Sequence, residues 1–270
     1  MPNIPISIEA KEELVDLIAE IEKKYQFVLL RSPYELMGLN MVSELFPKIV
    51  KFKTDGYRQE YGKFVLPFDA SDFVASHLLL CEKKKGGSLE PVLGFKSVTL
   101  EKCDQHRIHF PMLNMLDGED LNIIYKLTIK SIIDKYRLSG AGNKIAYNGS
   151  FTISPKLRGD SELMKHLWDV TFSLLTNYYI NYDIDHVVAI CATKFKVDKK
   201  KELRGWNYIE GEHGILKPYV CKSFFDAPAV PMELTNIKIK GKACAEKFKS
   251  MWEDRLTLDA DTLYDVKKAA

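Results

Sequence analysis

The sequence predicts a mixed α/β fold, with helices flanking a sheet, in a single domain. Residues 144–154 and 186–192 have the apolar character of strands, and residues 161–180 between them place apolar side chains on one helical face. The second of these strands is apolar throughout, which is typical of a strand with neighbours on both sides. No linker, internal repeat or change in composition divides the chain, so we expect one domain over residues 1–270.

The first part of the chain predicts helices, a short strand and a hairpin. In residues 7–24, leucines and isoleucines recur at helical spacing among charged residues, which predicts an N-terminal amphipathic helix. Residues 27–30 form a short apolar run suited to a strand, and residues 34–46, which follow a proline, suit a helix. Strand-like stretches at 76–81 and 92–100 are separated by KKKGGS, whose paired glycines favour a hairpin turn.

Further elements surround the strand, helix and strand described above. Residues 120–138 place isoleucines, a leucine and tyrosines on one helical face, and the SGAG that follows supplies glycines suited to a helix end. The basic segment 194–204 suits a short helix, and residues 230–239 suit another strand. A last helix is expected over residues 241–255.

Composition and charge exclude several classes of protein. The 270 residues are 46% hydrophobic and 28% charged, which describes a globular chain with a sizeable core. The formal net charge is only +2, and no aromatic residues interleave with the lysine runs, so we expect no nucleic-acid partner. Five widely spaced cysteines do not make a disulfide framework. Because the sequence has neither a long apolar run nor a signal peptide, we expect no integral membrane segment and a cytoplasmic location.

The stretch FTISPKLRGDSELMKHLW, residues 151–168, joins a strand to a helix and has the features of an anion site. Lys156 and Arg158 carry positive charge, Gly159 allows close approach of the backbone, and Asp160 or Ser161 can cap the helix. Free N–H groups at a helix N-terminus attract phosphate. An ordinary connection between a strand and a helix uses the same residue types, so spacing alone leaves both interpretations open.

This stretch, together with KKELRGW at residues 200–206, resembles the acyl-carrier core of the GCN5-related N-acetyltransferase (GNAT) superfamily. The first resembles the motif V-x-P-x-x-R-G-x-G-x-G, with Ser161 and Leu163 at its later glycines. Lys201 stands roughly where many members carry the tyrosine that protonates the departing thiolate. The resemblance implies a GNAT-like acyl-CoA N-acyltransferase fold.

The first half of the chain resembles one branch of that superfamily, the acyl-homoserine-lactone synthases and N-acyl amino acid synthases. The stretches LLRSPYELMGL, PFDASDFVASHLLL and VLGFKSVTLEKCDQHRIHFPMLNML carry this resemblance. They place Arg31, Asp69 and Asp72 at polar positions around the branch's acceptor site. NGSFTIS resembles its E-x-S-R-F strand, with Asn148 at the glutamate and Phe151 at the arginine.

The resemblance implies an N-acyltransferase that moves a medium or long acyl chain to the amine of a small, amino-acid-like acceptor. An acyl carrier protein or acyl-CoA thioester would be the co-substrate and partner, with no bound cofactor. Because an amine attacks only when neutral, a carboxylate near it can serve as base. The predicted catalytic residues are Glu101, Asp72, Asp69 and Asn148; the acyl-carrier contacts are Ser150, Phe151, Thr152, Ile153, Lys156, Arg158, Gly159, Asp160 and Ser161; the acceptor contacts are Arg31 and Asp72; and the carrier-protein docking residues are Lys194, Lys196, Lys199, Lys200 and Arg204.

Each candidate also has a structural interpretation. Asp69 and Asp72 precede an apolar run and suit a helix cap, and Glu101 closes a predicted strand, where it can be solvated. Cys103, His106 and His109 suggest a metal site, but the sequence offers no further pair at ligand spacing, so we expect no metal. The departures from the superfamily pattern leave a second function open, a GNAT-like sensor or interaction module that binds an acyl ligand without catalysis.

Overall fold

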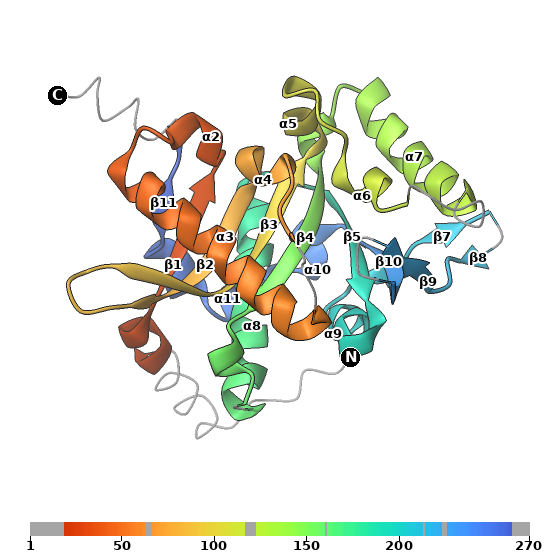
Figure 1. Ribbon diagram of the computed structural model, residues 1–270. Helices are drawn as coiled ribbons and strands as arrows, with labels where there is room; N and C mark the ends of the chain where they lie inside the picture. Colours follow the sequence, from red (N-terminus) through yellow and green to blue (C-terminus); the bar gives the residue numbers. More distant parts are fainter. Residues whose placement is uncertain are drawn as a thin grey trace.

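The computed structural model describes residues 19–62, 66–116, 123–159, 161–212, 214–222 and 226–260. Within these residues the chain forms one large mixed sheet with the strand order β11-β1-β2-β3-β4-β5-β10-β6, and β9 pairs with β10 (Figure 1). The sheet's strands are β1 (Tyr25–Arg31), β2 (Ser76–Lys83), β3 (Leu89–Thr99), β4 (Ile145–Ile153), β5 (His186–Ala192), β6 (Asn207–Tyr208), β9 (Tyr219–Cys221), β10 (Ala227–Thr235) and β11 (Leu256–Leu258); a separate pair is β7 (Glu210–Gly211) with β8 (Gly214–Ile215).

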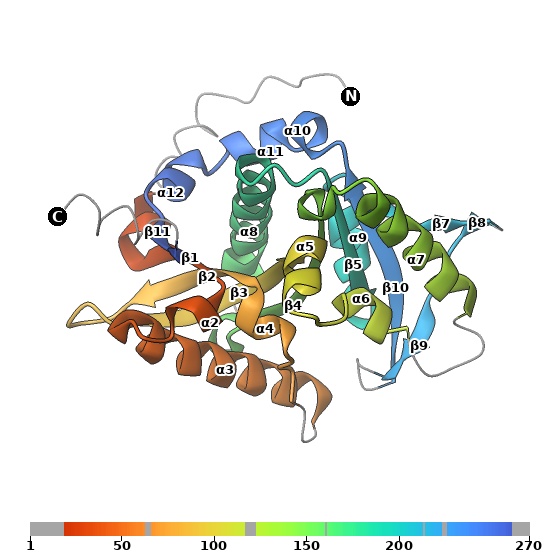
Figure 2. The same cartoon turned by 90° about the horizontal axis from the view of Figure 1, so that it is seen from above.

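Helices cover both faces of this sheet. Figure 2 shows α8 on one face and α3 on the other. The α3 face also carries α2 and α4, and further along it α5, α6 and α7, while short C-terminal helices pack beside α8. The helices are α2 (Pro33–Leu36), α3 (Asn40–Tyr61), α4 (Ser71–Val74), α5 (Leu100–Gln105), α6 (Pro111–Asn114), α7 (Ile123–Leu138), α8 (Ser161–Asn181), α9 (Val197–Glu202), α10 (Ile237–Lys240), α11 (Lys242–Glu246) and α12 (Lys249–Glu253), with 3-10 turns η2 (Gly142–Lys144), η3 (Pro155–Leu157) and η4 (Thr193–Phe195).

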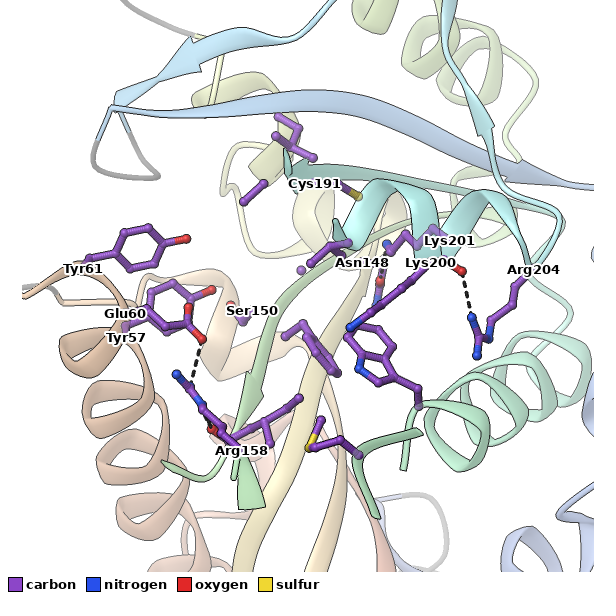
Figure 3. Close-up of a pocket in the computed structure, with 18 of the residues that line it drawn as sticks. Tyr57, Glu60, Tyr61, Asn148, Ser150, Arg158, Cys191, Lys200, Lys201 and Arg204 are labelled. Carbon is purple, nitrogen blue, oxygen red and sulfur yellow. Dashed lines mark hydrogen bonds and ion pairs between the residues drawn. The ribbon is translucent and has the colours of Figure 1, made fainter. Parts of the chain in front are cut away.

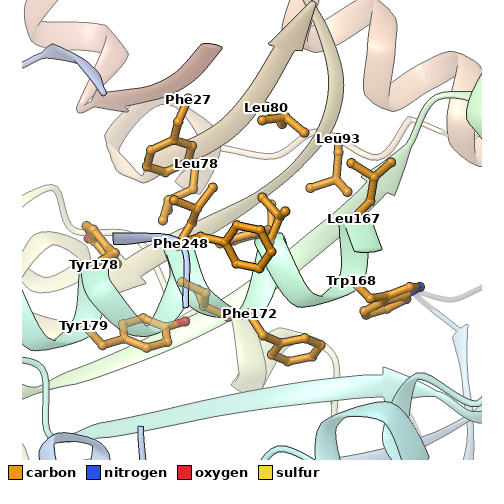
Figure 4. Packing of buried hydrophobic residues seen from close by; sticks show 14 of the residues in the cluster. Phe27, Leu78, Leu80, Leu93, Leu167, Trp168, Phe172, Tyr178, Tyr179 and Phe248 are labelled. Atoms are coloured by element: carbon orange, nitrogen blue, oxygen red, sulfur yellow. The ribbon is translucent and has the colours of Figure 1, made fainter. Parts of the chain in front are cut away.

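The largest core cluster lies between α8 and the sheet (Figure 4). Apolar residues of α8, among them Leu167, Trp168 and Phe172, pack in this cluster with strand residues such as Leu78 and Leu93. Two smaller clusters lie on the opposite face, under α3 and under α5 to α7. Because both faces are covered, β5 is buried along its whole length, as its continuous apolar sequence predicted.

The mixed α/β fold and its central elements are confirmed. KKKGGS lies in the turn between the antiparallel strands β2 and β3. The unit β4, α8 and β5 has the predicted order, and its two strands are parallel, as a helical crossover requires. The predicted helix at 120–138 is helical from Ile123, while residues 120–122 lie outside the described residues.

The second helical segment is longer than the predicted 34–46. A short helix, α2, begins at Pro33, and α3 then runs for 22 residues to Tyr61 with Pro47 inside it. Buried Val42, Ile49 and Phe52 hold this helix against the sheet on both sides of the proline. Packing of the apolar face therefore sustains the helix beyond the point where a proline is expected to break it.

The predicted terminal helices differ from the structure. Residues 19–24 are helical, and residues 7–18 of the predicted N-terminal helix lie outside the described residues. In place of one helix over 241–255 the chain forms the short helices α11 and α12. Phe248 leaves the helical conformation between them (φ −130°, ψ 40°) because its ring is buried against α8 and its N–H donates to Ser173 Oγ at 3.3 Å. The strand predicted over 230–239 ends at Thr235, and α10 follows.

Candidate acyl-transfer site

A cavity opens where strands β4 and β5 separate. Their parallel pairing runs only from Ile145 opposite His186 to Tyr147 opposite Val188. Just beyond this point β4 carries a β-bulge, because one residue of β3, Phe95, lies opposite both Ser150 and Phe151. Ser150 has a left-handed backbone (φ 55°) that makes the bulge. Beyond this point, no strand in the described part of the chain pairs with the facing edges of β4 and β5.

The resulting cavity has a volume of about 670 Å³ (Figure 3). Its walls combine apolar side chains with a carboxylate on the α3 side and cationic groups on the α9 side. The lining residues are Tyr57, Glu60, Tyr61, Asn148, Gly149, Ser150, Phe151, Ile153, Arg158, Met164, Lys165, Trp168, Ile190, Cys191, Ala192, Val197, Lys200, Lys201 and Arg204.

Aromatic rings and basic groups form the wall between α8 and α9. Trp168 packs on Phe151 in a tilted arrangement with ring centroids 4.6 Å apart, and Lys200 Nζ lies 4.2 Å from the centroid of the Trp168 ring. Burial, together with the neighbouring Arg204, lowers the pKa of Lys200. Arg204 donates to Asp169 Oδ1 at 2.7 Å. A half-buried cationic wall of this kind can hold an anionic part of a ligand.

Lys201 is the most unusual cation of the cavity. Its side chain is buried, its Nζ donates to Asn148 Oδ1 at 3.0 Å, and the same Nζ lies 3.7 Å from the centroid of the Trp206 ring. Within the described part of the chain, no carboxylate forms an ion pair with it. Burial therefore lowers the pKa of Lys201. An ammonium group without a counter-ion in a ligand-sized cavity can stabilise negative charge that a ligand carries or that develops on it during a reaction.

On the α3 side, Arg158 and Glu60 form an ion pair with Arg158 Nη2 2.9 Å from Glu60 Oε1. The guanidinium also donates to the carbonyls of Ile153 (2.9 Å from Nη2) and Gly56 (3.3 Å). The predicted anion-binding arginine thus ties α3 to the end of β4 and already faces a carboxylate. Burial raises the pKa of Glu60, although Arg158 and Lys194 act in the opposite direction.

A second cavity, of about 940 Å³, adjoins the first and shares Glu60 and Tyr61 with it. It lies at the end of β5 and the start of β10, and its lining is more polar. The lining residues are Glu60, Tyr61, Thr193, Lys194, Lys222, Asp226, Ala227 and Pro228.

Asp72 does not line either cavity. Its carboxylate is fully buried (0% exposed) and pairs with Lys53 Nζ and, at 2.8 Å, with Lys96 Nζ. Burial alone would raise the pKa of Asp72, but Lys53 and Lys96 outweigh it and hold the pKa well below its usual range. A carboxylate held ionised between two buried ammonium groups is a poor base, so the structure favours a structural role for the predicted catalytic Asp72.

Asp69 has the capping role that the sequence left open. Its Oδ1 accepts from Ser71 N at 2.7 Å, and its own N–H donates to Asp72 Oδ2 at 2.9 Å. Lys96 Nζ contacts the same Oδ1 at 3.0 Å. Together these bonds fix the start of α4.

The two predicted acceptor contacts lie on opposite faces of the sheet. Arg31 pairs with Asp259, and its guanidinium lies 4.4 Å from the Tyr182 ring that follows α8. Asp72 is on the α3 side, against Lys53. The structure therefore does not bring Arg31 and Asp72 into one site.

The remaining predicted residues divide between the cavity and the surface. Glu101 is exposed in the first turn of α5 rather than at the end of a strand, and it does not line either cavity. The predicted catalytic Asn148 lines the first cavity, as do residues 150, 151, 153 and 158 of the predicted acyl-carrier contacts. Of the other acyl-carrier contacts, Thr152 turns toward Gly56 of α3, and Lys156 and Gly159 are exposed. Asp160 and the side chain of Ser161 lie outside what is described.

The basic docking residues divide in the same way. Lys200 and Arg204 line the first cavity and Lys194 lines the second. Lys196 and Lys199 are exposed, and Lys199 Nζ lies 3.0 Å from Glu202 Oε2.

Neither a cluster of metal-ligating side chains nor a membrane-spanning helix occurs among the described residues. No three His, Cys, Asp or Glu side chains there gather closely enough to hold a metal ion, and Cys103 is buried in the core under α5. No helix among the same residues is long and apolar enough to cross a bilayer.

Sequence reasoning missed Tyr57, Glu60 and Tyr61. These residues occur at helical spacing on one face of α3, beyond Pro47, where the sequence was not interpreted as helix. An extended helical pattern could have placed them together on one face. Glu60 pairs in the cavity with Arg158, about a hundred residues away along the chain, a contact that no local pattern reveals.

Comparison with known proteins supports the fold. No protein-family model matches the chain, and no curated protein matches its sequence. Among solved structures, the CoA-dependent acyl-homoserine lactone synthase BjaI with SAM and isopentyl-CoA is 12% identical, with a TM-score of 0.54 over 87% of this chain and 93% of BjaI. BjaI with MTA gives a TM-score of 0.53 at the same identity and coverage.

A further match is FeeM, an N-acyl amino acid synthase from uncultured soil microbes, with 17% identity and a TM-score of 0.46 over 80% of this chain and 94% of FeeM. The fold implied by the sequence resemblance is therefore confirmed through BjaI. The chain has the fold of the CoA-dependent acyl-homoserine lactone synthase BjaI.

Proposed function

We propose that this protein is an N-acyltransferase that binds an acyl thioester between β4 and β5 and transfers the acyl group to the amine of a small acceptor. The observation that carries the proposal is the cavity of about 670 Å³ at the bulge in β4, where β4 and β5 no longer pair with each other. Backbone groups of this bulged edge that do not bond to β3 can bind the amides of a phosphopantetheine arm in the manner of an added strand, although the Ile153 carbonyl already accepts from Arg158.

Charge in the cavity fits a thioester better than a neutral ligand. The cations Lys200 and Arg204 lie on one wall, where a phosphate of the carrier can bind. Arg158, which resembles the superfamily's phosphate-binding arginine, is engaged with Glu60 and two carbonyls, so we assign the anion to the α9 side instead.

The same wall supplies a group for the chemical step. When the C–S bond breaks, the electron pair stays on sulfur, and the thiolate needs a proton or a nearby positive charge. Lys201 Nζ, buried beside Asn148, is the group we assign to this task. A lysine can replace a tyrosine here because burial lowers the pKa of its ammonium group toward that of a thiol.

The identity of the two substrates is the finer part of the proposal. BjaI carries isopentyl-CoA and SAM in its solved structure, and its fold supports a CoA thioester donor for this chain. The basic residues Lys196 and Lys199 at the surface near the cavity would also suit an acidic acyl carrier protein. For the acceptor we propose a small amino-acid-like amine.

Mass spectrometry of small-molecule extracts tests the proposal. The chain is overexpressed in a bacterial host and compared with a Val197→Trp variant, because Val197 lines the cavity at its partly exposed rim and a larger ring would fill it. We expect acylated amines with the wild type that are absent from the variant. Identical extracts, combined with a rise in melting temperature on adding octanoyl-CoA, would favour the acyl-ligand sensor instead.

A further inference from the structure

The two cavities of this protein meet at one carboxylate. Glu60 and Tyr61, at the end of α3, line both the apolar cavity between β4 and β5 and the more polar cavity at the end of β5. In Figure 3 the Glu60 side chain lies across the cavity from Lys200 and Lys201. If the thioester occupies the first cavity, as we propose above, its attacker can arrive from the second cavity and must pass Glu60.

Several charged or titratable groups face Glu60. Arg158 Nη2 lies 2.9 Å away and reaches it from the connection between β4 and α8, and Lys194 approaches from η4. Tyr57 and Tyr61 lie beside it on α3. Because desolvation outweighs the two cations, the carboxyl has a raised pKa and is a stronger base than a solvated glutamate.

The second cavity has the charge pattern of a site for a zwitterion. Two lysines, Lys194 and Lys222, and the carboxylate of Asp226 line it in addition to Glu60. An amino acid presents a carboxylate that lysines can bind and an ammonium group that carboxylates attract. Such a ligand can direct its amine toward Glu60 and the first cavity while the lysines hold its carboxylate.

We propose that Glu60 is the base of the acyl transfer and that the acceptor is a small zwitterionic amine bound in the second cavity. This proposal rests on the proposed function. Glu60 takes one proton from the acceptor's ammonium group and releases it to solvent. The neutral nitrogen then forms a C–N bond with the thioester carbonyl carbon, and the C–S bond breaks with its electron pair on sulfur. The nitrogen loses its second proton as the amide forms, and the sulfur gains one proton to become the thiol.

The test compares two kinds of acceptor with octanoyl-CoA as donor. One is an equimolar mixture of the protein amino acids, whose amines need deprotonation at pH 7, and the other is hydroxylamine, which is already neutral there. For Glu60→Gln we expect about a 100-fold loss of amino acid acylation, with hydroxamate formation at the wild-type rate. Glu60→Gln keeps the shape of the side chain, and Arg158 keeps its bonds to Ile153 and Gly56, so the variant should fold.

Asp226→Asn is the matched control, because Asp226 is a carboxylate of the second cavity alone. It should raise the KM for amino acids and leave the pH profile unchanged. If Glu60→Gln lowers the acylation of amino acids and of hydroxylamine by the same factor, Glu60 is not the base. A wild type that acylates hydroxylamine but no amino acid would overturn the acceptor assignment, whereas a wild type that acylates neither would contradict the proposed function itself.

The pH profile supplies a readout that a merely structural role would not change. A base must be ionised, so kcat/KM for amino acids should rise with pH through the pKa of Glu60. Arg158 favours the ionised form, and Arg158→Met should therefore move this rise to higher pH. An unmoved profile in Arg158→Met would contradict the proposal, as would a rise that persists in Glu60→Gln.

Discussion

Lys201 Nζ donates a hydrogen bond to Asn148 Oδ1 at 3.0 Å across the gap between α9 and β4. These are two of the positions at which the sequence departs from the motifs it resembles, with a lysine in place of a tyrosine and an asparagine in place of a glutamate. The structure shows that the departures are neighbours in one cavity. A glutamate at position 148 would neutralise Lys201, whereas the asparagine orients the ammonium group and leaves its charge available to a ligand.

The proposed role of Lys201 predicts a dependence on the leaving group. Lys201→Met should lower acyl transfer from octanoyl-CoA about 100-fold, because an alkyl thiolate needs a proton to leave. The variant should lose much less with an S-phenyl thioester, whose more acidic thiol leaves without help. Because the substitution removes a buried charge that has no ion-pair partner in the described chain, we expect no fall in melting temperature.

Lys200→Met is the matched control for this prediction. It removes the same charge from the neighbouring residue of the same cavity, and it should weaken binding of both donors by the same factor. If Lys201→Met also lowers both donors equally, Lys201 binds or positions the donor and does not protonate the thiolate.

Removal of Asp72 should lower the stability of the folded protein and not only its acyl-transfer activity. Asp72→Ala leaves the ammonium groups of Lys53 and Lys96, each about 2% exposed, without their shared buried carboxylate. We expect a loss of about 3–5 kcal/mol in the free energy of unfolding, measured by urea denaturation. Asp254→Ala, at an exposed carboxylate, is the control and should be nearly neutral. If Asp72→Ala is as stable as the wild type but inactive, Asp72 has a catalytic role and the structural interpretation is wrong.

His77 predicts a loss of stability in mild acid. Its Nε2 donates to the Asp72 carbonyl at 2.7 Å, its Nδ1 has no partner among the described groups, and burial, reinforced by Lys53, lowers its pKa to about 3. Between that value and about 6.5 the unfolded chain binds a proton that the folded chain does not. Stability should therefore fall as pH is lowered through this window, by at most about 1.4 kcal/mol per pH unit.

His77→Gln can keep the bond to the Asp72 carbonyl but cannot titrate. Urea denaturation at a series of pH values should show a flatter dependence in the variant than in the wild type. Equal slopes in the two proteins would mean that other groups cause the loss.

Gly56 holds the contact between α3 and β4. A Cβ at this position would lie 2.5 Å from Thr152 Cγ2 and 3.4 Å from Arg158 Nη2. Gly56→Ala should therefore move α3 away from β4, costing about 1–3 kcal/mol, although alanine favours helices. Gly38→Ala meets no atom within 4 Å and is the control. A Gly56→Ala protein that is more stable than wild type would show that the two elements can separate freely.

The sequence predicted those parts of the fold that depend on local pattern. The hairpin around KKKGGS and the order of β4, α8 and β5 follow from apolar periodicity and glycine placement. The prediction of one C-terminal helix was wrong because the tertiary contacts of Phe248, whose ring packs in the core beside α8 and whose N–H donates to Ser173 Oγ, outweigh the helical pattern.

The site was only partly predictable for a related reason. Residues 150–153 were found through a motif, and most of them line the cavity. Nothing in the sequence around Asp72 indicates that two buried lysines contact it. The partner of Arg31 is Asp259, which lies more than 200 residues further along the chain. Whether a charged side chain has a catalytic or a structural role depends on such long-range partners, and a sequence motif does not contain them.

Product analysis with the purified protein tests the central claim most directly. Wild type is incubated with octanoyl-CoA and the protein amino acids, and mass spectrometry quantifies free CoA and N-octanoyl amines. We predict that the two products form in equal amounts and that both disappear in Val197→Trp. Free CoA without any acylated amine would mean thioester hydrolysis, and no turnover at all would mean a binding protein; either result would contradict an N-acyltransferase.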